Sequence, residues 1–476
     1  MVFASLLFLM VFLPAAVGTY YACPRNDRSL RNLVLLAFSV MFFWWGGAPY
    51  LVIFALSALV DFLCGILIEK RSDRARLWLA TSLALNVSLL VYFKYANFFI
   101  GELNRLRGTF AATPVEWVMD VMLPIGISFF TFHKITYVVD VFRGTKPALR
   151  RFDDFALYLT FFPQLIAGPI VRFHEISGQL RGRQESLDAF FRGVLRFSLG
   201  LTKKVVVADP CGEVADAVFN ADPGVLNAGT AWIGAVAYAV QLYFDFSGYT
   251  DMALGLGLMF GFRLPENFNR PYRSVSITDF WRRWHMSLSR FFRDYVYIPL
   301  GGNRGSSIRT YANLILVFAL CGLWHGANWT FLIWGLYHGF WLVLERATSF
   351  GRGEAAKDTA VRRFATFGLV VIGWVIFRAN DLDHAGRFFT AMVTFGERPY
   401  SLAIETALNH RNLFVLSAAG AWELLAPTRY SITGLSTARL PAAGTLMRVA
   451  VAAGFVLYAV ASLATNSYTP FLYFRF

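Results

Sequence analysis

The chain has 476 residues, of which 57% are hydrophobic and 17% aromatic, while only 16% are charged. So large an apolar fraction excludes an ordinary soluble protein and indicates an all-α polytopic membrane protein. The formal net charge is +14, but the basic residues alternate with apolar runs along the chain, which argues against nucleic acid as a partner and favours a membrane lipid surface.

Apolar runs of membrane-crossing length, or slightly shorter, recur throughout the chain. They are residues 2–21, 30–46, 51–68, 77–93, 118–141, 189–208, 231–246, 311–324, 329–344, 364–377, 413–426 and 446–464. No basic segment precedes the first run and Pro14 interrupts it, so we expect a retained helix rather than a cleaved signal peptide. The pattern predicts one domain over residues 1–476 that crosses the membrane about 11 to 12 times.

Two further apolar runs, residues 155–170 and 252–262, are too short to cross a bilayer, and Pro163 and Pro169 break the first. Irregular backbone at membrane depth is tolerated only where protein or a cavity covers it. We therefore predict that both runs are re-entrant or half-spanning pieces.

Charge distribution predicts the orientation of the crossings. Basic clusters at residues 25–31, 70–76, 143–151, 263–309 and 346–363 should be cytoplasmic, whereas residues 209–222 carry only acids. With twelve crossings, both termini lie outside the cytoplasm, residues 97–116 form an outer loop, and the aromatic run 468–476 lies on the outer face.

Among the basic clusters, residues 263–309 hold nine arginines against three carboxylates. The positive-inside rule alone accounts for them, but arginine forks also suit the phosphate groups of a cytoplasmic ligand.

Residues 278–295 have the pattern of an amphipathic helix at the membrane surface. Their aromatic and leucine positions recur at steps of three and four residues, and a neighbouring stripe carries Arg282, His285, Ser289 and Arg293. We expect this stripe to face water or a ligand entry.

A titratable side chain at membrane depth is costly and usually functional. His325 ends the apolar run that begins near Tyr311, and it is therefore the first candidate for chemistry. The four cysteines lie far apart without paired spacing, so neither a metal site nor a disulfide framework is predicted.

Several short motifs follow one another in a characteristic order. The two main strings are Phe280-Trp-Arg-Arg-Trp-His285-Met-Ser-Leu-Ser289 and Trp324-His325-Gly326. The supporting strings are Tyr92-Phe-Lys-Tyr-Ala-Asn97, Leu123-Pro-Ile-Gly-Ile-Ser128, Phe162-Pro-Gln-Leu-Ile-Ala-Gly-Pro169, Leu242-Tyr-Phe-Asp-Phe-Ser-Gly-Tyr249, Glu266-Asn-Phe-Asn269, Gly301-Gly-Asn-Arg304 and Leu472-Tyr-Phe-Arg-Phe476. With these motifs the chain resembles the membrane-bound O-acyltransferase family, and within it the bacterial proteins of alginate O-acetylation.

The resemblance implies a ring of membrane helices around a central funnel in a bacterial inner membrane, with His325 as the catalytic histidine. It implies that His285 is a second catalytic histidine near the cytoplasmic side, while a structural role as a hydrogen-bonded helix histidine stays open for it. It further implies transfer of an acetyl group from a cytoplasmic donor such as acetyl-CoA, for O-acetylation of a secreted or cell-surface polysaccharide such as alginate. The family pattern also suggests a periplasmic partner acetyltransferase with a serine nucleophile. Relatives that carry D-alanine or other acyl groups to cell-wall polymers share the framework, so that alternative stays open.

Acyl transfer to a hydroxyl requires a proton acceptor, and neutral imidazole suits that role near pH 7. His325 is the predicted general base. Arg282, Arg283, Arg293 and Asn328 are the predicted donor-binding residues. Asn328, Trp324 or backbone amides near Gly326 are candidates to stabilise the oxyanion, although Asn328 is equally suited to cap a helix.

Other polar residues have weaker assignments. His338 follows His325 by 13 residues, which in an unbroken helix is about 20 Å, so we expect a structural role. Asp245 and Asp251 could orient a histidine or line a funnel. A rival function is a proton-coupled transporter in which His325 and Asp245 relay protons, but the surface helix and the absence of paired sequence repeats argue against it.

Overall fold

The computed structural model describes residues 2–109, 121, 124, 126–165, 168–348, 358–396, 398, 401–425 and 442–465. All regular elements in these residues are helices. The chain forms two compact units, one made of Met1–Phe190 with Gly257–Leu264 and the other of Phe191–Leu256 with Pro265–Phe476. Each unit is described by itself.

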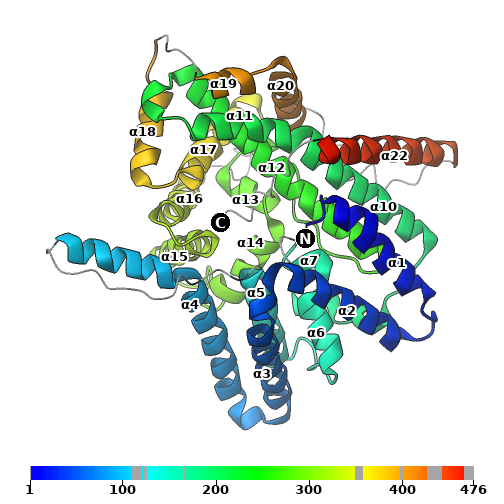
Figure 1. Ribbon diagram of the computed structural model, residues 1–476. Coiled ribbons are helices and arrows are strands. Elements are labelled where there is room, and N and C mark those ends of the chain that lie inside the picture. The colour runs from blue at the N-terminus through cyan, green and yellow to red at the C-terminus, as the bar shows by residue number, and fades with distance from the viewer. Residues whose placement is uncertain are drawn as a thin grey trace. The chain divides into compact units, whose positions relative to one another are not determined.

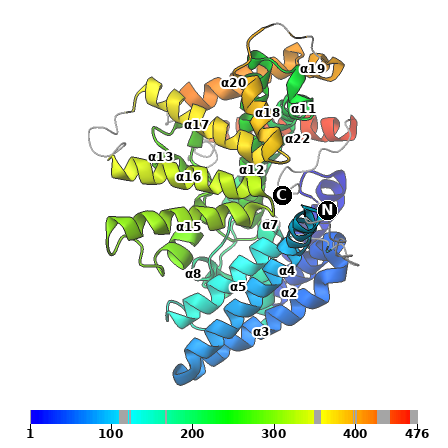
Figure 2. The same cartoon turned by 90° about the vertical axis from the view of Figure 1, so that its left-hand side faces the viewer.

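The first unit holds the N-terminal helices (Figures 1 and 2). They are η1 (Phe8–Phe12), α1 (Leu13–Ala22), α2 (Arg28–Gly47), η2 (Ala48–Tyr50), α3 (Leu51–Lys70), η3 (Ser72–Arg74), α4 (Ala75–Thr109), α5 (Ile127–Phe142), α6 (Phe152–Thr160), α7 (Phe162–Leu165), α8 (Phe173–Ile176) and α9 (Gln179–Gly182).

A buried polar cluster joins α3, α4 and α5 in this unit. Asp61 of α3 is fully buried and forms an ion pair with Lys134 of α5 at 3.1 Å. It also accepts hydrogen bonds from Ser82 and Asn86 of α4. Because a buried carboxylate is tolerated only when it is paired and hydrogen-bonded, this cluster specifies how the three helices pack.

The second unit holds the remaining helices. They are α10 (Leu187–Thr202) and α12 (Ala228–Met259), each for most of its length, with η4 (Lys203–Ala208), α11 (Asp209–Phe219), η5 (Pro223–Val225), η6 (Pro271–Arg273), α13 (Ile277–Arg283), α14 (Met286–Phe292), η7 (Arg293–Tyr297), α15 (Ser307–His325), α16 (Trp329–Ala347), α17 (Ala360–Arg378), α18 (Leu382–Met392), α19 (Leu402–Ala407), α20 (His410–Leu425) and α22 (Ala442–Thr465).

Helices α15 and α16 form a tight hairpin and lie side by side (Figures 1 and 2). A Cβ atom added to Gly322 would lie 2.2 Å from the Phe331 carbonyl oxygen, and one added to Gly335 would lie 2.2 Å from the Phe318 carbonyl oxygen. The two backbones therefore touch where these glycines face each other, a packing mode frequent between membrane helices.

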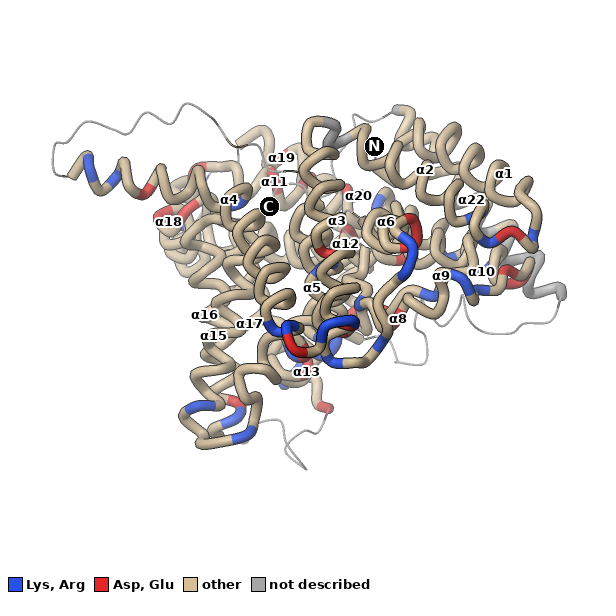
Figure 3. Tube along the Cα trace, turned by 90° about the horizontal axis from the view of Figure 1, so that it is seen from below, with Lys and Arg blue, Asp and Glu red and all other residues tan. Residues whose placement is uncertain are grey.

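Four helical segments in the described residues are long and apolar enough to cross a membrane: Leu51–Lys70, Ser72–Thr109, Ser307–His325 and Ala360–Arg378. The predicted crossings otherwise coincide with helices wherever they are described. Lys and Arg gather near helix ends and in connecting segments, while most helix interiors carry neither (Figure 3). This agrees with a membrane protein; the twelve crossings, the ring, the funnel and the single domain stay predictions, and residues 468–476 lie outside the described residues.

Two predicted boundaries are wrong. Helix α4 continues to Thr109, where an outer loop was expected from residue 97, because Phe99, Leu103 and Leu106 maintain helical spacing beside an ion pair between Glu102 and Arg105. Residues 252–259 continue α12 instead of forming a separate half-span.

Helix α12 continues without a break through Gly255. The sequence alone does not reveal why a glycine stands there. A Cβ atom there would lie 2.6 Å from the carbonyl oxygen of Gly193, so the glycine permits close contact between α12 and α10. The predicted break within residues 155–170 is confirmed, since α6 ends at Thr160 and α7 begins at Phe162.

Candidate functional site

The predicted amphipathic helix over residues 278–295 is interrupted at Trp284 and His285, which is a correction. Ser276 caps α13 by accepting a hydrogen bond from the Asp279 amide. After Trp284, His285 takes a left-handed conformation with φ 41° and ψ 53°, and α14 begins at Met286. Instead of facing water, His285 is fully buried. A non-glycine residue in this conformation is strained, and such strain is concentrated at functional sites.

Asn267 holds this corner in place. Its side-chain oxygen lies 3.1 Å from His285 Nδ1 and accepts hydrogen bonds from the Ser287 amide at 3.0 Å and the Ser287 hydroxyl at 2.8 Å. Its backbone oxygen accepts from the Met286 amide at 2.9 Å. Asn267 is fully buried, so the loop that precedes α13 determines the backbone between α13 and α14.

These contacts also assign the tautomer of His285. Because the Ser287 amide can only donate, the Asn267 atom that it meets is the oxygen, and His285 Nδ1 must then carry the proton. Nε2 is left with its lone pair, is buried, and has no hydrogen-bond partner among the described residues. His285 lies outside the predicted spans, and burial lowers its pKa to about 3, so the ring is neutral near pH 7 and able to accept a hydrogen bond or proton.

His325 lies at the C-terminal end of α15 and is 8% exposed. Three aromatic rings surround it edge-on: Trp324 at 4.8 Å, Trp334 at 5.1 Å and Phe377 at 5.1 Å between centroids. A Cβ atom added to Gly326, the next residue, would lie 2.0 Å from the Phe331 ring. The glycine therefore allows the chain to turn into α16 directly beside the imidazole.

Trp324 connects the two predicted catalytic histidines. Its ring centroid lies 4.8 Å from that of His325 and 6.3 Å from that of His285, and Phe246 of α12 packs against His285 at 4.8 Å. The structure thus brings His285 and His325 into one aromatic-walled region of the second unit.

His338 is closer to His325 than expected, which corrects the estimate for an unbroken helix. The chain reverses between α15 and α16, and the Trp334 ring lies 5.1 Å from each histidine ring. The two histidines are therefore separated by no more than twice that distance. His338 Nδ1 accepts a hydrogen bond from Trp281 Nε1 at 3.3 Å, which agrees with a structural role.

The three predicted donor-binding arginines differ in whether a carboxylate of the protein already pairs with them. Arg283 pairs with Asp279 at 2.9 Å and Arg293 with Asp294 at 2.7 Å. Arg282 is exposed and forms no ion pair within the described part of the chain. Arg282 is accordingly the arginine of this set with the most freedom to meet a ligand.

Asn328 caps α16. Its side-chain oxygen accepts from the Thr330 amide at 3.1 Å, and its Nδ2 donates to the Asn380 carbonyl at 2.8 Å. The structure therefore shows the capping role that the sequence left open; binding of donor or oxyanion by Asn328 stays a prediction.

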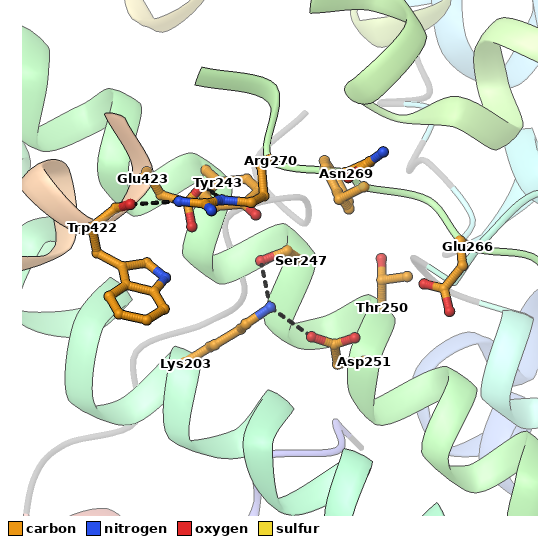
Figure 4. Close-up of a pocket in the computed structure, with 11 residues that line it drawn as sticks. Lys203, Tyr243, Ser247, Thr250, Asp251, Glu266, Asn269, Arg270, Trp422 and Glu423 are labelled. Carbon is orange, nitrogen blue, oxygen red and sulfur yellow. Dashed lines mark hydrogen bonds and ion pairs between the residues drawn. The ribbon is translucent and has the colours of Figure 1, made fainter. Parts of the chain in front are cut away.

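A buried charge cluster lies beside the site, and sequence reasoning recognised only its acids. Asp251 pairs with Lys203 at 2.6 Å (Figure 4). It also pairs with Arg196 at 2.9 Å, and Asp245 pairs with Lys204 at 3.0 Å. Each aspartate is therefore paired with at least one buried basic side chain, and a role in orienting a histidine stays a prediction. The signal was present in the sequence, because two lysines within the apolar run 189–208 require buried acidic partners.

The cluster borders a small cavity of about 30 Å³ lined by Lys203, Tyr243, Ser247, Thr250, Asp251, Glu266, Phe268, Asn269, Arg270, Trp422 and Glu423. The Thr250 hydroxyl is buried and has no hydrogen-bond partner among the described residues. This volume suits about two water molecules. In the described ranges, no three His, Cys, Asp or Glu side chains are grouped so that they could hold a metal ion.

Comparison with known proteins places these residues in a family. The profile of the membrane-bound O-acyltransferase family matches residues 146–379, which include both histidines. The chain is 44% identical to the probable alginate O-acetylase of Azotobacter vinelandii over the full length of both proteins. It is 47% identical to the probable alginate O-acetylase of Pseudomonas aeruginosa, with 83% of this chain and 75% of the relative covered. A peptidoglycan O-acetyltransferase of Helicobacter pylori is 38% identical, with 83% and 80% covered. The chain belongs to the membrane-bound O-acyltransferase family.

Proposed function

We propose that this protein transfers an acetyl group from cytoplasmic acetyl-CoA for O-acetylation of a secreted or cell-surface polysaccharide, with alginate as the favoured polymer. Full-length similarity to a probable alginate O-acetylase supports the reaction and the polymer class. The observation that carries the mechanism is the pair of buried histidines, His285 and His325, whose rings both lie next to Trp324.

His325 acts as the general base. Its imidazole removes the proton from the acceptor hydroxyl while the hydroxyl oxygen attacks the thioester carbonyl carbon. The tetrahedral intermediate then collapses, the carbon–sulfur bond breaks, and the proton passes to the leaving thiolate. Trp324, Trp334 and Phe377 restrict the orientation of the imidazole, so the proton acceptor is in position before substrate arrives.

His285 supports this reaction with its lone pair. Because Asn267 fixes the Nδ1 proton, Nε2 can accept a hydrogen bond from a substrate group or a water molecule that enters the aromatic region. We assign it a positioning role.

The acetyl donor approaches from the cytoplasmic side along the arginine-rich segment. Arg282 is exposed and not engaged by a carboxylate, so it is the first candidate to bind the phosphates of acetyl-CoA. Arg283 and Arg293 would have to exchange Asp279 and Asp294 for the donor.

Outside the cytoplasm, the acetyl group passes to the polysaccharide directly or through a periplasmic serine acetyltransferase partner. The protein resides in a bacterial inner membrane and crosses it several times. One relative is named a probable alginate O-acetylase and another a peptidoglycan O-acetyltransferase, and both names support a polymer acceptor of this kind.

The test is complementation of a strain that lacks the gene, with the O-acetyl content of its exopolysaccharide as the readout. We expect wild-type protein to restore acetylation and His325→Ala to fail at equal membrane abundance. His410→Ala is the matched control, because His410 is an exposed histidine at the start of α20. Normal acetylation with His325→Ala would remove this residue from the mechanism.

A further inference from the structure

The first unit contains an open cavity of about 350 Å³ near the connection between α1 and α2. It is lined by Tyr21, Arg25, Arg31, Glu185, Ser186, Leu187 and Phe190. Its volume is within the range typical of ligand sites. Nothing in the proposed acetyl transfer uses these residues.

Positive side chains outnumber negative ones around this cavity. Four guanidinium groups, those of Arg25, Arg28, Arg31 and Arg183, surround the single carboxylate of Glu185. Arg28 engages both carboxylate oxygens. Glu185 is therefore already satisfied largely by Arg28, and the cluster retains excess positive charge.

Arg25 and Arg31 carry that excess into the cavity. Arg25 donates a hydrogen bond to the backbone carbonyl of Glu185 at 3.2 Å, and its side chain is exposed. Arg31 is only 4% exposed. One of its terminal nitrogens donates to the Cys23 carbonyl at 3.0 Å, another lies 3.4 Å from Glu185, and its buried Nε has no hydrogen-bond partner among the described residues. Arg31 lines the cavity, and its charge is only partly balanced by Glu185, so an anionic ligand in the cavity would be stabilised.

The rest of the lining is apolar. The rings of Tyr21 and Phe190 pack edge to face at 5.7 Å, and Leu187 is 77% exposed although it is hydrophobic. One site therefore offers two arginines for a negative group and an apolar wall for a hydrocarbon chain. This combination suits an amphiphile and not a fully water-soluble anion.

We propose that this cavity binds an anionic phospholipid of the inner leaflet, with the phosphodiester on Arg25 and Arg31 and an acyl chain along Tyr21, Leu187 and Phe190. The basic cluster at residues 25–31 is predicted to lie on the cytoplasmic side, where anionic headgroups attract basic residues and occupy basic pockets between membrane helices. Arginine forms paired hydrogen bonds with phosphate oxygens.

The test uses the full-length protein in detergent with phosphatidylglycerol or phosphatidylcholine added, and native mass spectrometry to count retained lipid. We expect wild-type protein to retain phosphatidylglycerol preferentially, and the double variant Arg25→Gln with Arg31→Gln to reduce retention about tenfold, since loss of charge-assisted hydrogen bonds weakens binding by at least that factor. The matched control replaces Arg71 and Arg76, two exposed arginines of another predicted cytoplasmic cluster, and should retain lipid as the wild type does.

Because Arg31 is buried and its replacement could impair folding, a second variant is needed. Leu187→Glu introduces a negative charge at an exposed position of the wall, where it should repel the headgroup and reduce retention without loss of folded protein. Wild-type retention in both variants would overturn the proposal. Displacement of the lipid by coenzyme A or by inorganic phosphate at similar concentration would also overturn it, because the ligand would then be a soluble phosphate compound.

Discussion

His285 and His325 both lie next to Trp324, but different contacts hold them. His285 is fixed by hydrogen bonds to Asn267 and by a strained backbone, whereas His325 is restricted by three aromatic rings and by a glycine turn. Hydrogen bonds determine which nitrogen of a histidine carries the proton, so His285 keeps its Nδ1 proton and presents Nε2 as an acceptor. Packed rings determine how an imidazole is oriented, and three of them hold His325 beside Trp324. The difference between the two sites is therefore control of the tautomer at His285 and control of orientation at His325.

The largest expected effect comes from removing each imidazole in turn. We expect His325→Ala to reduce acetyl transfer roughly 10²- to 10⁴-fold, the usual range for loss of a general base. His285→Ala should reduce it roughly tenfold, the effect of one lost hydrogen bond. Rates of donor-dependent polymer acetylation in isolated membranes measure both. A larger loss at His285 than at His325 would exchange the two roles.

The glycine turn beside His325 provides the next test. Gly326→Ala would place a Cβ atom against the Phe331 ring and displace the imidazole, and misplacement of a catalytic group by about 1 Å can reduce rates on the order of 10²-fold. Gly368→Ala is the control, because a Cβ atom there meets nothing within 4 Å. Equal activity in the two variants would show that the turn does not position His325.

Replacement of Asn267 tests whether hydrogen bonds hold His285 in its active position. In Asn267→Ala the buried Nδ1–H of His285 and the Ser287 amide lose their acceptor, which should cost about 1–3 kcal/mol of stability and reduce activity roughly tenfold. Thermal unfolding in detergent and acetylation assays measure the two effects.

Asn267→Asp separates tautomer control from simple packing. A carboxylate retains the acceptor but favours the protonated imidazole, so it should raise the pKa of His285 from about 3. Because protonation removes the Nε2 lone pair, the acid limb of the pH–rate profile should move to higher pH. An unchanged profile in active protein would separate His285 from the reaction.

The smallest effect is expected at the arginines. Arg282→Gln should raise the acetyl-CoA concentration required for half-maximal rate by a few fold, about 1 kcal/mol of binding, whereas Arg293→Gln should change it less because Arg293 is paired with Asp294. Equal donor dependence in both variants and in the wild type, at unchanged protein abundance, would leave only a topological role.

The local sequence pattern was sufficient to predict where α15 ends and where α16 begins. Asn328 and the apolar runs around it predict a helix break beside His325, because capping and helical periodicity act over a few residues. The same reasoning failed at His285. The periodicity of residues 278–295 supports one continuous helix, and the force that breaks it comes from Asn267, a side chain that a single-sequence pattern does not bring next to His285.

Long-range pairing also explains what was missed around Asp245 and Asp251. Their partners, Lys203, Lys204 and Arg196, belong to a different helical segment. Sequence reasoning could recognise that charges in an apolar run need partners, but it could not choose among them. His338 was misplaced for a related reason, since distance along an ideal helix does not apply after a hairpin reversal.

The Asp61 cluster of the first unit has a consequence for the order of assembly during synthesis. Helix α3 emerges first with a carboxylate that is expensive at membrane depth. Helix α4 follows directly with Ser82 and Asn86 as neutral donors, but the counter-charge of Lys134 arrives only when α5 is made. We therefore expect the α3–α4 hairpin to enter the bilayer as a pair, with Asp61 close to the interface, and to reach its final depth only after α5 has joined it.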